Sequence, residues 1–552
     1  FQEGAANQFK LAAQPDRAAE QIDLFIQIVG IADQQAHRIF IPGEGQTEIR
    51  IQTLGGEAGV DFGFGQLFFV RQRQVEHLAV ERLKTEMHAE INPDMVLRRF
   101  LLCGQIEALA VFINGMSDQS LVSDFILRQG IPPRELPNDA PLIEYVANNV
   151  FAMAEVKQET SWNTIKTAIM DGCTAVFIQG QTTALTMDTR SYEHRSIQEP
   201  NNEKVVKGSQ EGFVENLRTN ITLIRRRVRT DDLVVELRTY GKEGSSRAAI
   251  MYREGIANES LVNEIKRRLA NVNAMYVFNA GTLEQLTERN TYSVFPQLLA
   301  TERPDRTAAM LMEGHVAVIV EGSPTANVMP ATLFTLMATG EDSTMRVVQG
   351  SVIRMVRYIG AAISILLPGY FLALALHHQS LLSSEVLTTV VASRKMVFAP
   401  IGMEMLFLLL VFQLVREAGM RVPGSIGQAI GIIGGLILGQ AAVTANLASS
   451  VMLIIVALTG LGNFCIPDYS TQLSASVLRV ILVIVSWLAG LMGLFCGVFV
   501  IIAWMASLKS FGVPFLAPHS PKANSKRPMI LRGPIDNVSR HKDILNTEED
   551  GR

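Results

Sequence analysis

The chain has little cysteine and no excess of positive charge. Its 552 residues include four cysteines, which are scattered at Cys103, Cys173, Cys465 and Cys496 without metal-ligand spacing. The sequence therefore predicts neither a disulfide framework nor a zinc site. Lysine and arginine number 49 against 53 acidic residues, and the formal net charge is −4. A nucleic-acid-binding protein needs a strongly basic face to neutralise phosphates, so this class of partner is excluded.

Nucleotide-binding and catalytic motifs are also missing. A phosphate-binding loop requires a glycine-rich fingerprint that opens a helix, such as GxxxxGKS or GxGxxG, and the sequence contains neither. His194 and His315 have no nucleophile or metal ligand as an obvious partner in the sequence. We therefore expect a protein that is not an enzyme and has no catalytic residue, no cofactor and no metal.

The N-terminal segment is poor in methionine and rich in glutamine. No methionine precedes Met87, although the chain has 22 of them. Two interpretations stay open: a variable polar arm over residues 1–86, or a translated upstream region with the start of the protein near Met87. The segment lacks the charged start, apolar run and cleavage site of a signal peptide. We expect the front part to stay on the cytoplasmic side.

Charge is absent from long stretches of the C-terminal half. No charged residue occurs in 358–376, 426–447, 451–466 or 480–508. A helix needs about 20 apolar residues to cross a hydrocarbon core, and helix formation satisfies its backbone amides in lipid. The sequence therefore predicts an all-α polytopic membrane domain over residues 350–508, behind a polar front.

Basic residues give this domain an orientation. Arg346, Arg354 and Arg357 lie at the start of the first expected span, and the positive-inside rule places that end in the cytoplasm. Five full crossings would put the basic tail, 509–552, outside. We therefore predict four spans, the last at 480–508, and one re-entrant or interfacial helix, at 451–466 or 397–415.

One acidic residue lies within the apolar part. A carboxylate at membrane depth costs several kcal/mol unless it meets a partner or water. Glu404 has two open interpretations. It is either an interfacial carboxylate or a salt-bridge partner of Arg394 or Lys395, or it is a cation-attracting group in an oligomeric pore.

The stretch 426–447 is rich in small and amide side chains. Four glycines at four-residue spacing predict close helix packing: Gly427, Gly431, Gly435 and Gly439. The alternative is a pore-lining or substrate-contacting face that includes three polar residues: Gln428, Gln440 and Asn446.

The polar front contains a duplicated unit. The segment 110–128, AVFINGMSDQSLVSDFILR, parallels 250–268, IMYREGIANESLVNEIKRR. Both are typical of a strand, a glycine, Asp118 or Asn258 as helix N-cap, and an amphipathic helix. A second match pairs 169–180 with 311–322 at nearly the same offset. We therefore predict two α/β subdomains with mixed sheets, at 92–195 and 233–340.

A charged helical linker, 196–232, joins the two copies. Acidic residues precede the run Arg225, Arg226 and Arg227, and apolar residues recur at helical spacing from Asn216 to Val228. One interpretation is a solvated helix whose basic end complements its dipole. The other is a surface that binds a partner subunit or lipid headgroups.

At this linker the sequence resembles a known family. SIQEPNNEKVVKGSQEGFVENLRTNITLIRRRV, at 196–228, is similar to the linker of the GerA spore germination family, the A subunits of germinant receptors. Three more blocks resemble the family in the same order: TERPDRTAAMLMEGHVAVIVEGSP (301–324), REAGMRVPGSIGQAIGIIGGLILGQAAV (416–443) and SFGVPFLAP (510–518). The chain departs from the family at Leu409 and Gln413, where further acids are usual, and at GEDSTMRVVQG (340–350), which replaces an acidic, tyrosine-rich stretch.

The resemblance implies a multi-pass protein of the spore inner membrane whose soluble front faces the core. It implies a transporter-like B subunit and a lipoprotein C subunit as partners, and a homo-oligomeric channel that releases cations when a nutrient arrives. The residues it assigns to the linker and to assembly are Glu199, Pro200, Arg225, Arg226, Arg227, Arg303, Asp305 and Arg306. Two alternatives stay open: a SpoVAF-type germination channel subunit without a nutrient pocket, and a non-conducting scaffold or signalling subunit.

Overall fold

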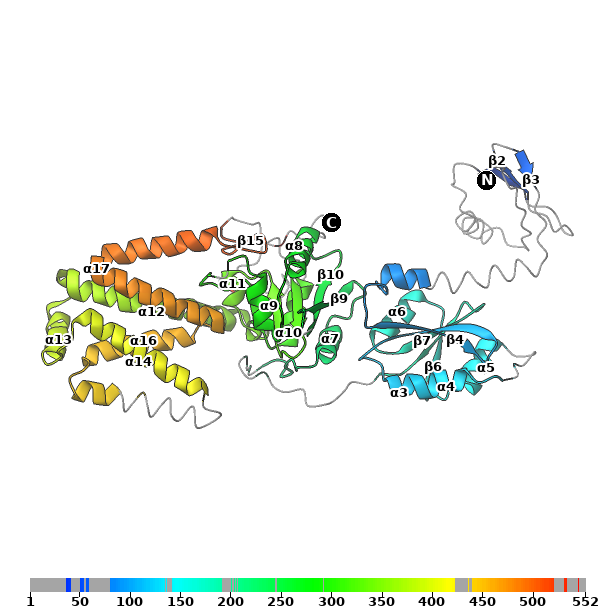
Figure 1. Cartoon of the computed structure of the whole chain (residues 1–552), viewed down its shortest axis with the longest axis horizontal. Helices are drawn as coiled ribbons and strands as arrows, with labels where there is room; N and C mark the ends of the chain where they lie inside the picture. Colours follow the sequence, from blue (N-terminus) through cyan, green and yellow to red (C-terminus); the bar gives the residue numbers. More distant parts are fainter. Residues whose placement is uncertain are drawn as a thin grey trace.

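The computed structural model describes most of the chain after residue 79. The described residues are 36–40, 50–53, 56–58, 531–533, 545, and 80–520 apart from 135, 137–140, 191–199, 201–202, 204, 206, 244–245, 291, 422–434 and 436–438. A helical part, a central subdomain and an outer subdomain follow one another along the long axis (Figure 1). Near the N-terminus, a small sheet contains three strands: β1 (Ala36–Phe40), β2 (Arg50–Thr53) and β3 (Gly56–Ala58).

Subdomain 1, the outer one, is built on a five-stranded sheet of order β4-β5-β7-β8-β6. Its strands are β4 (Met95–Leu102), β5 (Ile106–Ile113), β6 (Val156–Glu159), β7 (Thr174–Ile178) and β8 (Ala184–Met187). Its helical segments are α3 (Gln119–Leu121), the π-helix η1 (Val122–Leu127), α4 (Arg128–Gly130), α5 (Leu142–Asn149) and α6 (Trp162–Met170).

Subdomain 2, the central one, repeats this arrangement in the order β9-β10-β12-β13-β11. Its strands are β9 (Leu233–Tyr240), β10 (Ser246–Arg253), β11 (Leu299–Thr301), β12 (Val316–Val320) and β13 (Ala326–Met329). Its helices are α7 (Leu217–Arg225), α8 (Glu259–Ala270), α9 (Ala280–Thr287) and α10 (Pro304–Met312).

The matching strand orders confirm the predicted duplication. Asp118 and Asn258 both act as N-caps, because each side chain accepts a hydrogen bond from a backbone N–H in the first turn of its helix. The predicted mixed sheet is wrong, however, since every pairing between the named strands is antiparallel. The short links at 103–105 and 179–183 are hairpins, which join only antiparallel strands.

Helix α7 is part of the core of subdomain 2. Leu217, Ile221 and Ile224 are buried at the predicted helical spacing and pack with residues of β9 and β10. The interpretation of the linker as a solvated helix is therefore wrong. In subdomain 1, residues 80–86 form the corresponding helix, and Leu83 is fully buried beneath the sheet. These residues belong to subdomain 1 and not to the N-terminal arm, where the sequence placed them.

Ten further elements follow subdomain 2 within the described residues. They are α11 (Leu333–Leu336), η2 (Gly340–Ser343), α12 (Val347–His377), η3 (Gln379–Leu381), α13 (Ser384–Arg394), α14 (Ile401–Arg421), α16 (Ser450–Phe464), α17 (Tyr469–Ser507), β14 (Lys509–Ser510) and β15 (Val513–Pro514). Among the described residues, α12 and α17 are long and apolar enough to cross a membrane by length and composition, and α16 is a shorter apolar helix.

Element α17 consists of two antiparallel helical arms that form a hairpin. Gly490 has a φ of +62° and interrupts the helical backbone, which glycine permits because it has no Cβ. Both ends return to one place on subdomain 2: Ser474 donates to the carbonyl of Val294, and the Trp504 ring lies 5.5 Å from that of Phe295. Figure 1 shows both arms directed toward this subdomain. The span predicted at 480–508 is therefore divided at Gly490.

The other long helices lie alongside this hairpin in definite directions. The last residue of α12, His377, contacts Gly490 at the hairpin tip. Helix α14 begins at this far end, where Gly402 meets Trp487, and runs back toward subdomain 2, where Arg416 lies over the Tyr469 ring. Helix α16 also begins at the far end and runs back.

The segment after the last helix returns to subdomain 2. Phe511 and Phe515, in the block that the sequence marked at 510–518, are buried in the two cores on either side of the sheet. Ser510 donates to the carbonyl of Gln297 and accepts from the backbone N–H of Ala331 at 3.0 Å. The tail motif is thus a structural part of subdomain 2.

Candidate functional site

A network of charged side chains joins the linker, subdomain 2 and α12. We call it the charged junction, and it comprises Glu203, Arg303, Asp305, Arg306, Asp342, Arg354 and Arg357. The sequence singled out Arg303, Asp305 and Arg306. It missed Glu203 and Asp342 as members and noted Arg354 and Arg357 only as topology signals.

The linker is tied to α10 through Glu203 and Arg306. One oxygen of Glu203 lies 2.5 Å from Nη1 of Arg306, and the other accepts from the Thr301 hydroxyl at 2.5 Å and from the backbone N–H of Glu302 at 3.0 Å. Nη2 of Arg306 donates to the carbonyl of Ala338 at 2.7 Å. One guanidinium therefore fixes the linker and the chain that leads into α12.

Arg303 is buried in the same network. Its side chain is 2% exposed, and Nη2 lies 2.6 Å from Asp305 and 3.0 Å from the carbonyl of Ser209. Nη1 donates to the carbonyl of Glu203 at 3.2 Å. Both Nη atoms of this buried guanidinium find acceptors, whereas Nε has no hydrogen-bond partner among the described residues. Arg303 thus holds two points of the linker, Glu203 and Ser209, against the start of α10.

Asp342 holds the start of α12. Its side chain is 2% exposed and accepts from Arg354 at 2.9 Å and from both Nη atoms of Arg357, at 3.0 and 2.8 Å. Burial opposes ionisation, but these two guanidinium groups outweigh it and hold the pKa of Asp342 below its ordinary value. Asp342 lies in the block 340–350, where the sequence departs from the family pattern.

Two carboxyl groups lie close together at the start of α17. Asp468 is the N-cap of this helix and accepts from the backbone N–H of Thr471 at 2.7 Å. Burial raises the pKa of Glu284, on α9, to about 7, and the negative charges of Glu288 and Asp468 add to this effect. The charges of Arg306 and Glu203, two members of the charged junction, also act on Asp468.

We expect Glu284→Gln to remove a pH dependence from this contact. The pKa of Glu284 rises from 4.5 to about 7 in the folded chain, so the folded state holds a proton that the unfolded state releases. The resulting stability is present below pH 4.5, falls as the pH rises through 7, and amounts to roughly 3 kcal/mol at most. The thermal midpoint of the purified full chain, measured from pH 5 to 8, should fall less steeply in Glu284→Gln than in the wild type. Glu385→Gln, an exposed control, should keep the wild-type slope, and equal slopes in all three proteins would contradict the assignment.

The arginine run of the linker is engaged within the chain. Arg225 is 3% exposed and pairs with Asp94 at the start of β4, with Nη2 at 2.9 Å from the carboxylate. Asn92 supports the same joint, because its side-chain oxygen accepts from the backbone N–H of Val235 at 2.7 Å. Arg227 pairs with Glu211. The contacts of Arg225 and Asn92 connect the two subdomains, and that of Arg227 lies within the linker, which favours a structural role for both arginines.

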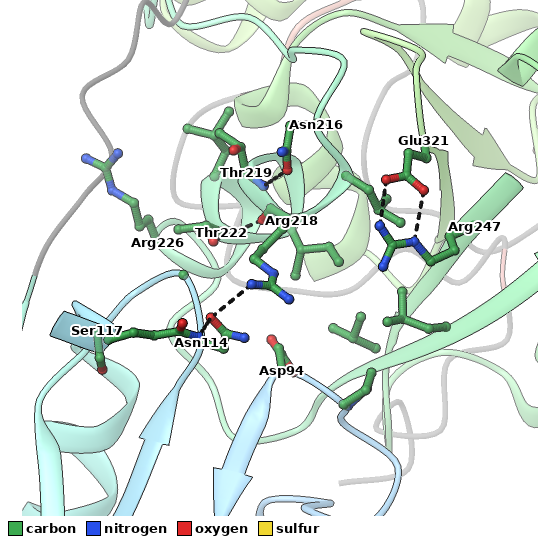
Figure 2. Close-up of a pocket in the computed structure, with 18 of the residues that line it drawn as sticks. Asp94, Asn114, Ser117, Asn216, Arg218, Thr219, Thr222, Arg226, Arg247 and Glu321 are labelled. Atoms are coloured by element: carbon green, nitrogen blue, oxygen red, sulfur yellow. Dashed lines mark hydrogen bonds and ion pairs between the residues drawn. The ribbon is translucent and has the colours of Figure 1, made fainter. Parts of the chain in front are cut away.

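A cavity of about 670 Å³ lies between the two subdomains and α7. Figure 2 shows Arg218 directed toward Asn114, whose side-chain oxygen is 3.4 Å from Nη1, and Arg247 paired with Glu321 at 2.9 and 2.7 Å. Arg226, the remaining arginine of the run, also lines the cavity. The hydroxyl, amide and guanidinium groups of the wall can hydrogen-bond a small polar molecule. Among the described residues, no group of three or more His, Cys, Asp and Glu side chains can hold a metal ion.

Glu404 is buried inside the helical part. It is 1% exposed, one oxygen lies 3.0 Å from Nε of Arg394, and the other accepts from the backbone N–H of Ser449 at 2.6 Å. Of the two interpretations given to Glu404, this geometry favours the salt bridge with Arg394. The carboxylate also fixes the beginning of α16 against α14.

The structure describes some of the other residues that the sequence analysis selected. Gln440 and Asn446 are exposed in the single chain, as is Gly435, and an added Cβ at Gly435 would have no heavy atom within 4 Å. Gly439 contacts Leu453, and Pro200 is buried. Four predicted residues lie outside the described part of the chain: Glu199, Gly427, Gln428 and Gly431.

Close helix packing occurs at glycines that the sequence analysis did not select. A Cβ on Gly462 would lie 2.5 Å from the carbonyl oxygen of Gly360, and one on Gly402 would lie 2.3 Å from the Trp487 ring. Helices α12 and α16 therefore approach each other through their backbones. A regular spacing of glycines along one helix could not have identified them, because Gly462 and Gly402 lie on different helices and contact different partners.

Comparisons with known proteins give the family. The model of the Bacillus/Clostridium GerA spore germination protein matches residues 81–544. Spore germination protein A1 of Bacillus subtilis (strain 168) is 34% identical over 461 residues, which cover 83% of this chain and 94% of that protein. Spore germination protein KA of the same organism is 32% identical over 446 residues, 80% of this chain and 82% of that protein.

Two further proteins are similar over different lengths. Stage V sporulation protein AF of Bacillus subtilis (strain 168) is 29% identical and covers 80% of this chain and 89% of its own length. The crystal structure of the N-terminal domain of the A subunit of the Bacillus megaterium spore germinant receptor GerK3 is 27% identical, covers 46% of this chain and 94% of that chain, and has a TM-score of 0.36. From the match of the family model over most of its length, the chain belongs to the GerA spore germination protein family.

Proposed function

We propose that this protein is the A subunit of a spore germinant receptor and acts in nutrient-triggered germination as an oligomeric, cation-releasing membrane channel. Membership of the family supports the germination role. The charged junction is the observation that carries the mechanism, because Asp342, Arg354 and Arg357 fix the first long apolar helix to the soluble subdomains. A displacement of the soluble part would therefore move α12.

The directions of the helices support an arrangement with six crossings. Helix α12 leads away from subdomain 2, α14 and α16 lead back, and α17 leads away and back again. We assign the remaining outward crossing to the uncharged sequence 426–447 between α14 and α16, most of which lies outside the described residues. Six crossings return the basic tail to the side of the soluble part, as the positive-inside rule requires. This proposal differs from the prediction, made from the sequence alone, of four spans and one re-entrant or interfacial helix.

The exposed amides support a pore between copies of the chain. Gln440 and Asn446 are exposed in the single chain, whereas both oxygens of Glu404 are already engaged. We therefore assign the pore-lining role to Gln440 and Asn446 and a positioning role to Glu404. As partners we propose other copies of the chain, a transporter-like B subunit and a lipoprotein C subunit in the spore inner membrane.

Nutrient-triggered cation release from spores tests this assignment. In spores that carry Gln440→Leu with Asn446→Leu, we expect release to fall at least fivefold while the amount of protein in the membrane is unchanged. Glu404→Ala should lower the amount of protein, because Arg394 and the Ser449 N–H lose their acceptor. Unchanged cation release in the double variant would contradict the pore-lining role of Gln440 and Asn446.

The similarity to stage V sporulation protein AF favours a second candidate, a SpoVAF-type channel subunit without a nutrient pocket. Spores that lack the transporter-like partner would distinguish the two candidate functions. A receptor A subunit would lose its nutrient response in these spores, and a SpoVAF-type subunit would not. Cation flux through the purified oligomer in liposomes separates both from a non-conducting scaffold.

A further inference from the structure

Two arginines are buried together in the helical part of the chain. Arg416, on α14, is 8% exposed, and Arg479, on α17, is 3% exposed. Their positive charges act on one another, so the fold places like charges together away from water. Such an arrangement is strongly destabilising unless an anion compensates it.

The donors of this pair are not all used. Nη2 of Arg479 donates to Asn463 and Ser476, both at 3.0 Å, and Arg416 lies over the Tyr469 ring at 5.7 Å. In this region, four buried donor nitrogens have no hydrogen-bond partner among the described residues: Nη1 and Nη2 of Arg416, Nε of Arg479 and Nδ2 of Asn463. The Asn463 amide has a defined orientation, because its oxygen accepts from Ser364 at 3.1 Å and from Arg479. Free donors from three helices therefore meet in one region.

Acidic residues are sparse in the sequence around these donors. No acidic residue occurs between Glu417 and Asp468, a stretch that contains all of α16. Glu404 is bound to Arg394 and Ser449, and Asp468 caps α17 through Thr471. Within the described part of the chain, neither of these carboxylates accepts a hydrogen bond from the four free donors.

We propose that Arg416, Arg479 and Asn463 form a binding site for a phosphate group, supplied by an anionic phospholipid headgroup or by free inorganic phosphate. A guanidinium presents a planar fork of N–H groups that matches the oxygens of phosphate. A phosphate has enough peripheral oxygens to accept from donors on all three helices, whereas a carboxylate has two.

The position of the site suits the headgroup source. Arg416 lies over Tyr469, the first residue of α17, at the end of the helices that faces subdomain 2. In the proposed six-crossing arrangement this level is the cytoplasmic face of the bilayer, where anionic headgroups attract basic residues. The placement of the site at the cytoplasmic face rests on the proposed function, whereas the set of free hydrogen-bond donors does not depend on it.

The test uses the full chain, purified and stripped of lipid in detergent. We would measure its thermal midpoint with phosphatidylglycerol, phosphatidylcholine or inorganic phosphate, and count bound lipids by native mass spectrometry. Phosphatidylglycerol should raise the midpoint and stay bound where phosphatidylcholine does not. Stabilisation by inorganic phosphate alone would identify the free ion as the source.

Variants assign the binding to these residues. Arg416→Gln with Arg479→Gln should weaken the apparent affinity for the phosphate ligand at least tenfold. Lys509→Gln, which removes an exposed cation just after the last residue of α17, should leave it unchanged. If the double variant does not fold, the comparison of the three ligands on the wild-type protein still tests whether the chain binds a phosphate group.

Three results would overturn the proposal. They are a wild-type protein that neither phosphatidylglycerol nor phosphate stabilises, a double variant that binds as the wild type does, and stabilisation by a partner subunit only, which would assign the arginines to a protein carboxylate. None of these measurements depends on channel activity, so failure here and failure of the proposed function are distinguishable.

Discussion

Replacement of Asp342 by asparagine should destabilise the chain by about 3–5 kcal/mol, because it leaves a buried guanidinium without its counter-charge. Arg357 is 9% exposed and directs both Nη atoms at this carboxylate. An amide can accept one of these bonds but cannot balance the charge. We expect a clear drop in the thermal midpoint of the purified full chain, and loss of nutrient-triggered cation release in spores.

Two further variants show what Asp342 contributes. Glu385→Gln removes an exposed acidic residue at the start of α13 and should change neither measurement. Asp342→Leu with Arg357→Met leaves no unpaired partner in this pair and should recover part of the stability. It should not recover cation release, since the connection between subdomain 2 and α12 is lost. A midpoint for Asp342→Asn within about a degree of the wild type would contradict the importance of the charged junction.

Alanine at Gly462 should separate α12 from α16 and lower the yield of correctly folded protein several-fold. The added Cβ would lie 2.5 Å from the carbonyl oxygen of Gly360 and 3.1 Å from the backbone nitrogen of Ser364. Backbone atoms cannot rotate away as the end of a side chain can, so the cost should exceed the 1–3 kcal/mol that is typical of overpacking. Size-exclusion profiles and thermal midpoints in detergent measure the effect.

Gly435→Ala is the matched control, because an added Cβ there meets no heavy atom of the described residues within 4 Å. It should leave the fold and the yield unchanged. If copies of the chain pack through this helix, the same variant should reduce the oligomer without lowering the stability of the protomer. Equal losses in Gly462→Ala and Gly435→Ala would show that contacts within the chain do not distinguish these glycines.

The duplication and the linker helix could be predicted because local sequence determines them. Asn258 and Asp118 cap equivalent helices through their own side chains, and Leu217, Ile221 and Ile224 mark one buried face of α7. Both signals lie within a few turns of the chain. The sequence did not show that α7 packs into subdomain 2, since amphipathic spacing predicts a buried face but not the surface that covers it.

The junction and the hairpin could not be predicted in the same way. Asp342 meets arginines 12 and 15 residues later across a turn, a spacing that no regular element produces. Gly490 reverses the chain in the middle of a stretch without charge. A hydropathy profile therefore has no minimum at this position that would indicate the turn. Glu404 was identified as needing a partner, and Arg394 was one of two candidates named. Choosing between them required the fold.

The return of the tail to subdomain 2 sets an order for the biosynthesis of the protein. Phe511 and Phe515 complete the two cores of this subdomain, yet the ribosome makes them only after both arms of α17. Until then, the core that faces Phe515 lacks one of its fully buried aromatic rings. Subdomain 2 is therefore closed last, once the apolar helices have left the ribosome. A nascent chain that stops short of residue 511 would expose a hydrophobic gap by which quality-control proteases could recognise it.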